Sequence, residues 1–364
     1  MIIKSLELLN YRNYESLNME FDSGTNILYG DNAQGKTNIL EAVYLSGTTK
    51  SHRGSKDKEI ISFEKDESHI RTVVEKNDNE YCIDIHLKKK GAKGIAVNKV
   101  PIKKARDLFG ILNIVVFSPE DLYIIKEGPQ MRRRFMDMEL CQIDRIYLSD
   151  LTKYNKTLLQ RNKLLKDLYY RPELKDTLDI WDMQLIETGK KIIARRNRFI
   201  NELMPVVYDI HKKLTGDKED LKILYEPETD EESFERNLKE NREKDLKFGS
   251  TSVGPHHDDI KFLINDTDIR KYGSQGQQRT SALSLKLSEI KIVEEIIKDK
   301  PILLMDDVLS ELDSSRQNFL LNNITDTQTI VTCTGLDEFI KNRFEIDKIF
   351  EVIEGHVYEN KEIV

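Results

Sequence analysis

The most constraining feature of this chain is a glycine-rich loop of eight residues that begins at Gly30. It matches the pattern G-x-x-x-x-G-K-[ST] at every fixed position. In such a loop the glycines let the backbone curl so that N–H groups surround a phosphate, the lysine adds a positive charge, and the threonine hydroxyl suits Mg²⁺. The pattern therefore predicts that a nucleotide is bound by Gly30, Asp31, Asn32, Ala33, Gln34, Gly35, Lys36 and Thr37, with Thr37 also on the metal ion.

The segments on either side of the loop fit this prediction. Residues 26–29 are a short apolar stretch typical of a strand, and residues 38–45 repeat with helical periodicity. A strand, a loop and a helix in this order place the positive end of the helix next to the bound phosphate. A chance match on an unrelated turn is not expected in this setting.

A pair of aspartates supplies the carboxylates that such a site needs. Residues 302–305 are all apolar and predict a buried parallel strand, and Asp306 and Asp307 follow at its carboxyl end. We expect Asp306 to contact the metal ion. Asp307, one residue further, is placed to act as the general base that polarises a water molecule.

A third motif lies between these two. Ser274 and Gly276 come directly before a helical segment, where a hydroxyl, free N–H groups and the helix dipole attract an anion. The chain's own phosphate loop is already served by another helix. The expected ligand of this motif is therefore the γ-phosphate of ATP bound by a second copy, which predicts an ATP-dependent homodimer. An ordinary serine cap at the start of a helix is the alternative.

The middle of the chain differs in character from its ends. Residues 1–130 and 249–364 alternate between strand and helix patterns, which predicts one α/β domain, ATPase lobe I, built from both parts. Residues 131–248 are expected to form an inserted helical lobe, lobe II. Apolar residues recur there at spacings of three and four over 140–158 and 178–210, which predicts an antiparallel helical hairpin.

Several residues in and beside this lobe carry further expectations. Pro205 is expected to kink or interrupt the second helix, and the charged stretch 229–247 is expected to form an exposed helix. The arginines at 132–134 are expected to pair with acidic groups rather than to bind phosphate. His256 and His257 are expected to lie on a strand and point to opposite faces, which argues against a shared metal ion.

Composition restricts the compartment and the partners. No stretch approaches the roughly 18 apolar residues needed to span a bilayer, and the N-terminus lacks a signal-peptide pattern. Three scattered cysteines without a C-x-x-C pair argue against disulfides and zinc. We therefore expect a cytoplasmic protein with no membrane partner.

Charge limits how this chain could bind nucleic acid. Its net charge is −7, so a DNA partner would need a local basic patch or a surface that forms on assembly. Residues 86–106 hold seven lysines, one arginine and no acidic residue. They form either a solvated hairpin or a patch for DNA.

The order of these motifs resembles that of the ABC-type, SMC-like ATPases: a phosphate loop, an inserted lobe, an S-x-G signature, paired acids and an S-x-L-D turn. Within this class the chain is similar to the RecF family over nearly its whole length. The strings that carry the similarity are Y-R-N-Y at 11–14, S-H-R at 51–53, F-S-P-E-D-L at 117–122, G-P at 128–129, R-R-R-F at 132–135, G-P-H-H-D-D at 254–259 and S-Q-G-Q-Q-R at 274–279. The last two are the most specific.

The resemblance implies an α/β fold, an ABC-type ATPase head of the P-loop NTPase kind with an inserted helical lobe. It implies a cytoplasmic protein of recombinational repair and replication restart that binds ATP and Mg²⁺, dimerises and engages duplex or gapped DNA. RecR and RecO are the partners it suggests, with recombinase loading as the outcome. Weak, DNA-stimulated hydrolysis would reset the dimer, with Lys36, Ser274 and Asp307 in catalytic roles. Arg12 would contact the nucleotide, although a solvated turn arginine fits the sequence equally well.

Three positions depart from the wider ABC pattern. Many relatives carry glutamate where this chain has Asp307, and residues 117–120 replace the usual glutamine-containing metal-sensing loop. Thr334 stands near the place of the switch histidine of transporters. These departures imply weak hydrolysis. The missing switch histidine, the length of the helical lobe and the RecF-like strings argue against the main alternative, the nucleotide-binding motor subunit of a membrane transporter. A small-molecule phosphotransferase is a further alternative, which the signature helix argues against.

Overall fold

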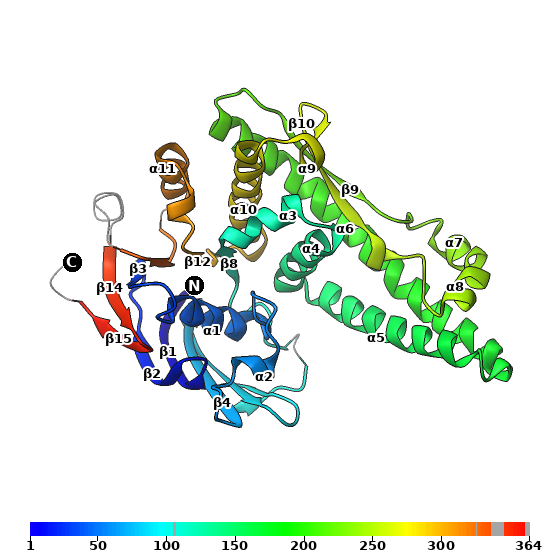
Figure 1. The fold of residues 1–364 in the computed structure, drawn as a ribbon, viewed down its shortest axis with the longest axis horizontal. Coiled ribbons are helices and arrows are strands. Elements are labelled where there is room, and N and C mark those ends of the chain that lie inside the picture. Colours follow the sequence, from blue (N-terminus) through cyan, green and yellow to red (C-terminus); the bar gives the residue numbers. More distant parts are fainter. Residues whose placement is uncertain (105–106, 325, 336–345, 361–364) are drawn as a thin grey trace. The chain divides into compact units, whose positions relative to one another are not determined.

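The computed structural model describes residues 1–104, 107–324, 326–335 and 346–360. They belong to two compact units (Figure 1). Unit 1 comprises Met1–Asp121 and Glu289–Val364, and unit 2 comprises Leu122–Ser288. This mixed α/β architecture with a helical insertion is the fold class that the sequence predicts.

The limits of the units differ from the expected lobe limits at 130/131 and 248/249. In unit 2, β9 (Leu221–Glu226) pairs in antiparallel with β10 (Asp259–Ile264). This pairing joins residues on both sides of position 248, so the segment that follows it stays with the helical unit up to Ser288. Periodicity along the sequence does not reveal such a pairing.

The central sheet of unit 1 carries the phosphate loop. Its strand order is β15-β14-β3-β13-β12-β8, with neighbours parallel except for β15 at the edge. The first four residues of β12 are buried, as their uninterrupted apolar sequence predicts. Because the parallel strands end at one edge, the segments after β3, β12 and β13 meet there. These strands are β3 (Thr25–Tyr29), β8 (Ile114–Phe117), β12 (Ile302–Asp306), β13 (Thr329–Cys333), β14 (Ile346–Ile353) and β15 (His356–Glu359).

A second sheet of unit 1 is antiparallel throughout, with the order β2-β1-β4-β5-β6-β7. Helix α1 (Lys36–Thr48) is nearly all buried and packs against strands of both sheets. Packing on two sides fixes the direction of the helix that starts at the phosphate loop. The remaining elements of unit 1 are β1 (Ile2–Tyr11), β2 (Tyr14–Glu20), β4 (Glu67–Lys76), β5 (Asn79–Lys88), β6 (Gly94–Val97), β7 (Val100–Pro101), α2 (Asp57–Ile60), η2 (Pro119–Asp121), η5 (Leu309–Glu311) and α11 (Ser314–Asn322).

Unit 2 is built around the predicted helical hairpin of α5 (Arg145–Asp167) and α6 (Leu178–Thr215). Near one end of the hairpin Arg161 bonds to Asp182, and near the other end Tyr147 bonds to Arg196, so the helices are antiparallel. A three-stranded sheet, β11-β10-β9, completes the unit. Its other elements are α3 (Leu122–Lys126), α4 (Pro129–Ile143), η3 (Pro172–Thr177), α7 (Phe234–Glu240), α8 (Arg242–Phe248), η4 (Pro255–His257), β11 (Thr267–Asp268), α9 (Ile269–Tyr272) and α10 (Gln275–Ile297), which continues into unit 1.

Two expectations for this unit are corrected. Pro205 lies inside α6 and does not interrupt it, since helix continues on both sides of the proline, and the alternative of a kink stays a prediction. The charged stretch 229–247 forms two short helices rather than one exposed helix. Phe234, Leu238 and Asp245 are buried, because α7 packs against α6 and α8 packs against α5.

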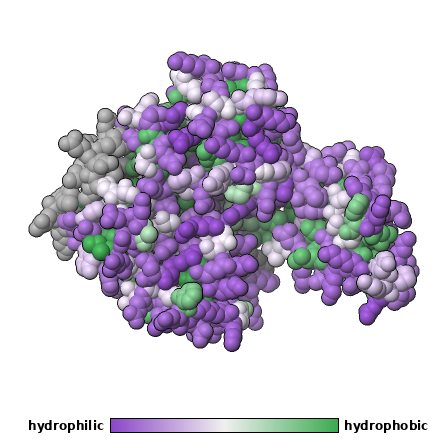
Figure 2. Space-filling view, viewed as in Figure 1, coloured by the Kyte–Doolittle hydropathy of each residue, from purple (hydrophilic) through white to green (hydrophobic). Residues whose placement is uncertain are grey.

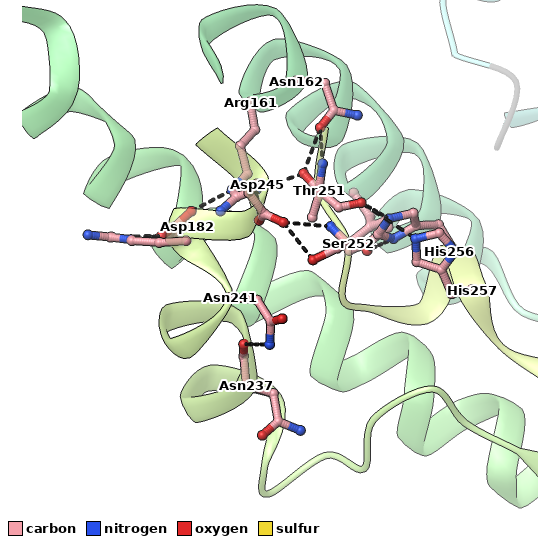
Figure 3. A network of polar contacts seen from close by, with 12 residues as sticks. Arg161, Asn162, Asp182, Asn237, Asn241, Asp245, Thr251, Ser252, His256 and His257 are labelled. Atoms are coloured by element: carbon pink, nitrogen blue, oxygen red, sulfur yellow. Dashed lines mark hydrogen bonds and ion pairs between the residues drawn. The ribbon is translucent and has the colours of Figure 1, made fainter. Parts of the chain in front are cut away.

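A buried polar network ties α8 and the following loop to the hairpin (Figure 3). The guanidinium of Arg161 is fully buried and donates to Asp182 over 2.6 Å, Asp245 over 2.7 Å and Thr251 over 2.8 Å. Ser252 in turn donates its hydroxyl hydrogen to Asp245 over 2.6 Å. Each carboxylate therefore faces a charge or a hydroxyl, as buried ions require.

The arginines at 132–134 and the paired histidines also lie in unit 2. Arg132 binds Asp259 through two N–H groups, over 2.5 and 3.0 Å, which confirms the predicted acidic pairing for this residue. His256 and His257 lie in η4 rather than on a strand, with ring centroids 4.2 Å apart.

Within the described part of the chain, no three metal-ligating side chains gather. No described helix is long and apolar enough to cross a bilayer. Hydrophilic residues cover most of the face seen in Figure 2.

Candidate nucleotide-binding site

The phosphate loop has the tight, left-handed backbone that its glycines permit. Gly30 and Gly35 have φ angles of 147° and 118°, and Ala33 has a φ of 65°. A Cβ atom on Gly35 would lie 2.6 Å from the amide nitrogen of Asn13 and 2.7 Å from the hydroxyl of Tyr14. Only glycine therefore fits at position 35, directly before the first turn of α1.

Two segments distant in sequence hold the loop from outside. Asn13 Nδ2 donates to Gln34 O over 2.9 Å. From the turn between β14 and β15, Glu354 N donates to Gln34 Oε1 over 2.5 Å and Gly355 N donates to Gln34 O over 3.2 Å. The contribution of Glu354 and Gly355 is not predictable from the sequence, because no local pattern marks a turn as the neighbour of a loop about 320 residues earlier.

The side chain of Lys36 folds back over the start of the phosphate loop. Its Nζ donates to the carbonyl of Gly30 over 2.5 Å and to that of Asp31 over 2.7 Å. Burial lowers the pKa of this amine, and the nearby carboxylates of Asp307 and Asp306 oppose that effect. The charge of Lys36 is thereby held at the centre of the curled backbone, where the pattern predicts phosphates.

Thr37 and Asp306 meet at the edge of the central sheet. Thr37 Oγ1 donates to Asp306 Oδ1 over 2.8 Å, and Thr332 Oγ1 on β13 donates to the same oxygen over 2.9 Å. A hydroxyl and a carboxylate side by side, next to a phosphate loop, are the hard oxygen donors that Mg²⁺ prefers. The residues present fit the metal ion that the sequence predicts.

Asp307 lies one residue further along, with a φ of 53° in the left-handed region. Its backbone N–H donates to Thr332 Oγ1 over 3.0 Å, and Ser310 Oγ donates to its carbonyl over 2.7 Å. Burial and the neighbouring Asp306 raise the pKa of Asp307, while Lys36 opposes the rise. A raised pKa makes a carboxylate a better proton acceptor.

Ser274 caps α10 in unit 2, in a reciprocal capping box. Its hydroxyl accepts from Gln277 N over 3.2 Å, and its own N–H donates to Gln277 Oε1 over 2.9 Å. Ser274 therefore does cap the helix, as the alternative expected. Capping uses only a lone pair of the hydroxyl oxygen, so the hydroxyl hydrogen of Ser274 is still free to donate. Ser274, Gln275 and Gly276 are all exposed, as a contact with another molecule requires.

Arg12 is bound by protein groups rather than left in solvent. Its Nε and one terminal nitrogen donate to the two oxygens of Glu41 over 2.8 and 2.7 Å. The same guanidinium reaches Ser55 Oγ and the carbonyl of Glu59. Burial acts to raise the pKa of Glu41, but hydrogen bonds from Arg12 and Ser51 hold it below its usual value. The solvated-turn alternative is therefore corrected, and a nucleotide contact by Arg12 stays a prediction.

The remaining predicted segments lie in unit 1. Residues 117–120 begin with the last residue of β8, the edge strand of the central sheet, and Thr334 is exposed after the inner strand β13. The basic stretch 86–106 runs from the end of β5 through the edge strands β6 and β7 of the second sheet, and residues 105 and 106 lie outside the described residues. Some of its lysines are paired, such as Lys93 with Asp57 at 3.1 Å. A contact of this edge with DNA stays a prediction.

Comparisons with known proteins identify the family of this chain. Residues 2–356 match the family model described as the RecF/RecN/SMC N terminal domain. The chain is 66% identical over 357 residues to the DNA replication and repair protein RecF of Agathobacter rectalis, covering 98% of this chain and 99% of that protein. It is 62% identical over 359 residues to the protein of the same name from Lachnospira eligens, covering 98% and 99%.

Solved structures give the same result. A structure of the recombination mediator protein RecF-ATP in the RecFOR pathway has a TM-score of 0.93 at 38% identity, covering 99% of this chain and 97% of that one. An SMC head domain from Pyrococcus furiosus has a TM-score of 0.56 at 16% identity, which shows the fold alone. The fold class is confirmed, and a transporter subunit is not favoured. The chain belongs to the RecF family of DNA replication and repair proteins, within the SMC-like ATPases.

Proposed function

We propose that this chain is an ATP-gated DNA clamp of recombinational repair. Two copies would bind head to tail, with each ATP between the phosphate loop of one copy and the Ser274 end of α10 in the other. ATP is the proposed ligand because a related RecF with 38% identity is described as RecF-ATP. DNA is the proposed partner because the similar curated proteins are named for DNA replication and repair.

Each site residue then has a role in binding or turnover. The N–H groups of residues 30–37 would surround the phosphates, and Lys36 would exchange its two carbonyl partners for phosphate oxygens. Thr37 and Asp306 would hold Mg²⁺, which neutralises phosphate charge when bound. Asp307 would accept the proton of the attacking water. Its side chain is one methylene shorter than that of glutamate, which supports weak hydrolysis. That hydrolysis would reset the clamp, and DNA would accelerate it.

The observation that carries the proposal is the exposed end of α10. An N-cap serine with a free hydroxyl hydrogen, followed by an exposed glycine, is a surface for an anion. No acidic residue lies in the first turn of α10 to occupy it. A γ-phosphate presented by a second copy carries the negative charge that this surface attracts.

The proposed partners follow from the same relatives. RecR and RecO are proposed because the related RecF structure is described within the RecFOR pathway. The clamp would mark gapped DNA or a junction of single-stranded and duplex DNA, and these partners would then help a recombinase to load. Work on chromosomal DNA would place the chain in the cytoplasm.

Light scattering coupled to size exclusion tests the assembly. Without nucleotide we expect a mass near the 42.5 kDa of one chain, and with ATP and Mg²⁺ roughly twice that mass. Ser274→Arg should abolish the ATP-dependent dimer, because the long side chain blocks the approach of the second copy. Its monomer should bind ATP as the unmodified chain does, since Lys36 and Thr37 lie in another unit. A monomer at saturating ATP in the unmodified chain would overturn the proposal, and a lost ATP affinity in Ser274→Arg would show that the serine acts within one chain.

A further inference from the structure

A chain of hydrogen bonds leads from Ser274 into the interior of unit 2. Ser274 N donates to Gln277 Oε1 over 2.9 Å, and Gln277 Nε2 donates to Glu219 Oε1 over 3.0 Å. The other carboxylate oxygen of Glu219 lies 3.2 Å from Nε2 of His211. On its far side, Nδ1 of His211 lies 3.0 Å from Ser284 Oγ, within α10. The chain of contacts therefore starts and ends on the helix whose first residues form the signature.

The two neighbours of Gln277 fix the orientation of its amide group. The backbone N–H of Ser274 can only donate, so it must meet the amide oxygen. The carboxylate of Glu219 can only accept, so it must meet the amide nitrogen. Without Glu219 the amide could turn over and present its nitrogen to the N–H of Ser274, which would open the capping box.

His211 holds Glu219 from the interior. It lies in the last turn of α6, its side chain is fully buried, and Glu219 is partly buried in the short loop that follows. Burial lowers the pKa of His211, and the hydrogen bond with Glu219 opposes the shift. Because the carboxylate of Glu219 cannot donate, an N–H of His211 belongs on Nε2. The hydroxyl of Ser284, whose Oγ lies 3.0 Å from Nδ1, donates its hydrogen to the carbonyl of Thr280 over 2.8 Å.

We propose that Glu219, held by His211, is a positioning residue for the signature serine. It keeps Gln277 in the orientation that closes the capping box and so aims the hydroxyl of Ser274 out of the helix end. A group set in place before its ligand arrives loses less freedom on binding. This inference rests on the proposed function, because the aim of the serine matters only if a nucleotide of a second copy meets it.

Three variants of one short loop test the proposal. Glu219→Ala removes both hydrogen bonds. Glu219→Gln keeps an oxygen for Gln277, and its amide nitrogen can donate to His211 once the imidazole adopts its other tautomer. Lys218→Ala is the matched control, since this neighbouring side chain is exposed. All three should show the far-ultraviolet circular dichroism of the unmodified protein.

Amide hydrogen exchange, measured on the full chain without nucleotide, shows directly whether the capping box is closed. In Glu219→Ala we expect the amide hydrogens of Ser274 and Gln277 to exchange about three- to tenfold faster, the effect of losing one supporting hydrogen bond. Glu219→Gln should restore slow exchange, and Lys218→Ala should not change it. Unchanged exchange in Glu219→Ala would overturn the positioning role, whatever the fate of the proposed dimer.

Light scattering with ATP then connects the capping box to assembly. For Glu219→Ala we expect a dimer dissociation constant raised about three- to tenfold, with an unchanged ATP affinity of the monomer and with rescue by Glu219→Gln. A dimer as strong as that of the unmodified chain would contradict the link between capping box and assembly. If the unmodified chain itself stays monomeric with ATP, the proposed function fails instead, and the exchange result still decides whether Glu219 positions Ser274.

Discussion

Asp306 and Asp307 are adjacent carboxylates with different surroundings, which support the different roles proposed for them. Asp306 ends a buried strand, and its Oδ1 accepts hydrogen bonds from Thr37 and Thr332. Asp307 has a left-handed backbone and a raised pKa, which burial and the charge of its neighbour produce. The first is suited to hold a cation and the second to accept a proton.

The Asp307→Asn variant tests this division at the residue scale. We expect ATP affinity to persist and turnover to fall by about 100-fold or more, because general base catalysis contributes at least that factor. Dimers should therefore accumulate with ATP. In the unmodified protein, turnover should decrease as the pH is lowered through the raised pKa of Asp307, because protonation removes the base. Phosphate release at a series of pH values measures both effects, and an Asp307→Asn variant with full turnover would exclude the assigned role.

At the scale of elements, local patterns predicted what local sequence determines. The strand before Gly30, the helix after Lys36 and the buried strand before Asp306 were all expected, because each depends on periodicity and on a motif inside one short stretch. The contacts of Gly355 with the phosphate loop and of Glu219 with Gln277 could not be predicted. Both contacts join segments that are distant in sequence, and neither residue type nor spacing marks them.

The charged segment before Gly249 shows a second limit. Its acidic and basic residues predict an exposed surface, yet Asp245 is buried beside Arg161. A charge pattern indicates a solvated face only when no partner of opposite charge is available inside the fold. Here the partner comes from α5, 84 residues earlier, and the pair becomes part of the core.

The Arg161→Leu variant measures what this network contributes to the helical unit. It leaves Asp245 buried without its cation, whereas Asp182 keeps its ion pair with Arg242 at 2.7 Å. The unpaired buried carboxylate should destabilise the fold by about 3–5 kcal/mol. Lys191→Ala is the control, since its ion pair with Glu187 on α6 is solvent-exposed and should contribute far less. Urea unfolding followed by circular dichroism gives both values. Equal effects of the two substitutions would mean that the buried network adds no more than a surface pair.

At the scale of the whole molecule, charge and assembly are linked. A net charge of −7 gives a single chain no general attraction for DNA, so the proposed clamp depends on joining surfaces from two copies. Two weak contacts made by one rigid dimer reinforce each other, because the second contact forms within the complex. Nucleotide would thus control DNA binding through the number of surfaces that meet the duplex at once.

DNA affinity should therefore depend on ATP as well as on salt. For a fluorescent duplex at constant salt, we expect binding at least roughly tenfold tighter with ATP than without it, a modest gain for bivalent attachment. The logarithm of the affinity should fall more steeply with the logarithm of salt concentration for the dimer, because more phosphates are neutralised. Lys36→Ala should bind DNA weakly, with a shallow dependence of affinity on salt, whether ATP is present or not. Fluorescence anisotropy measures all three, and an affinity for DNA that ATP does not alter would mean that one chain alone provides the whole DNA-binding surface.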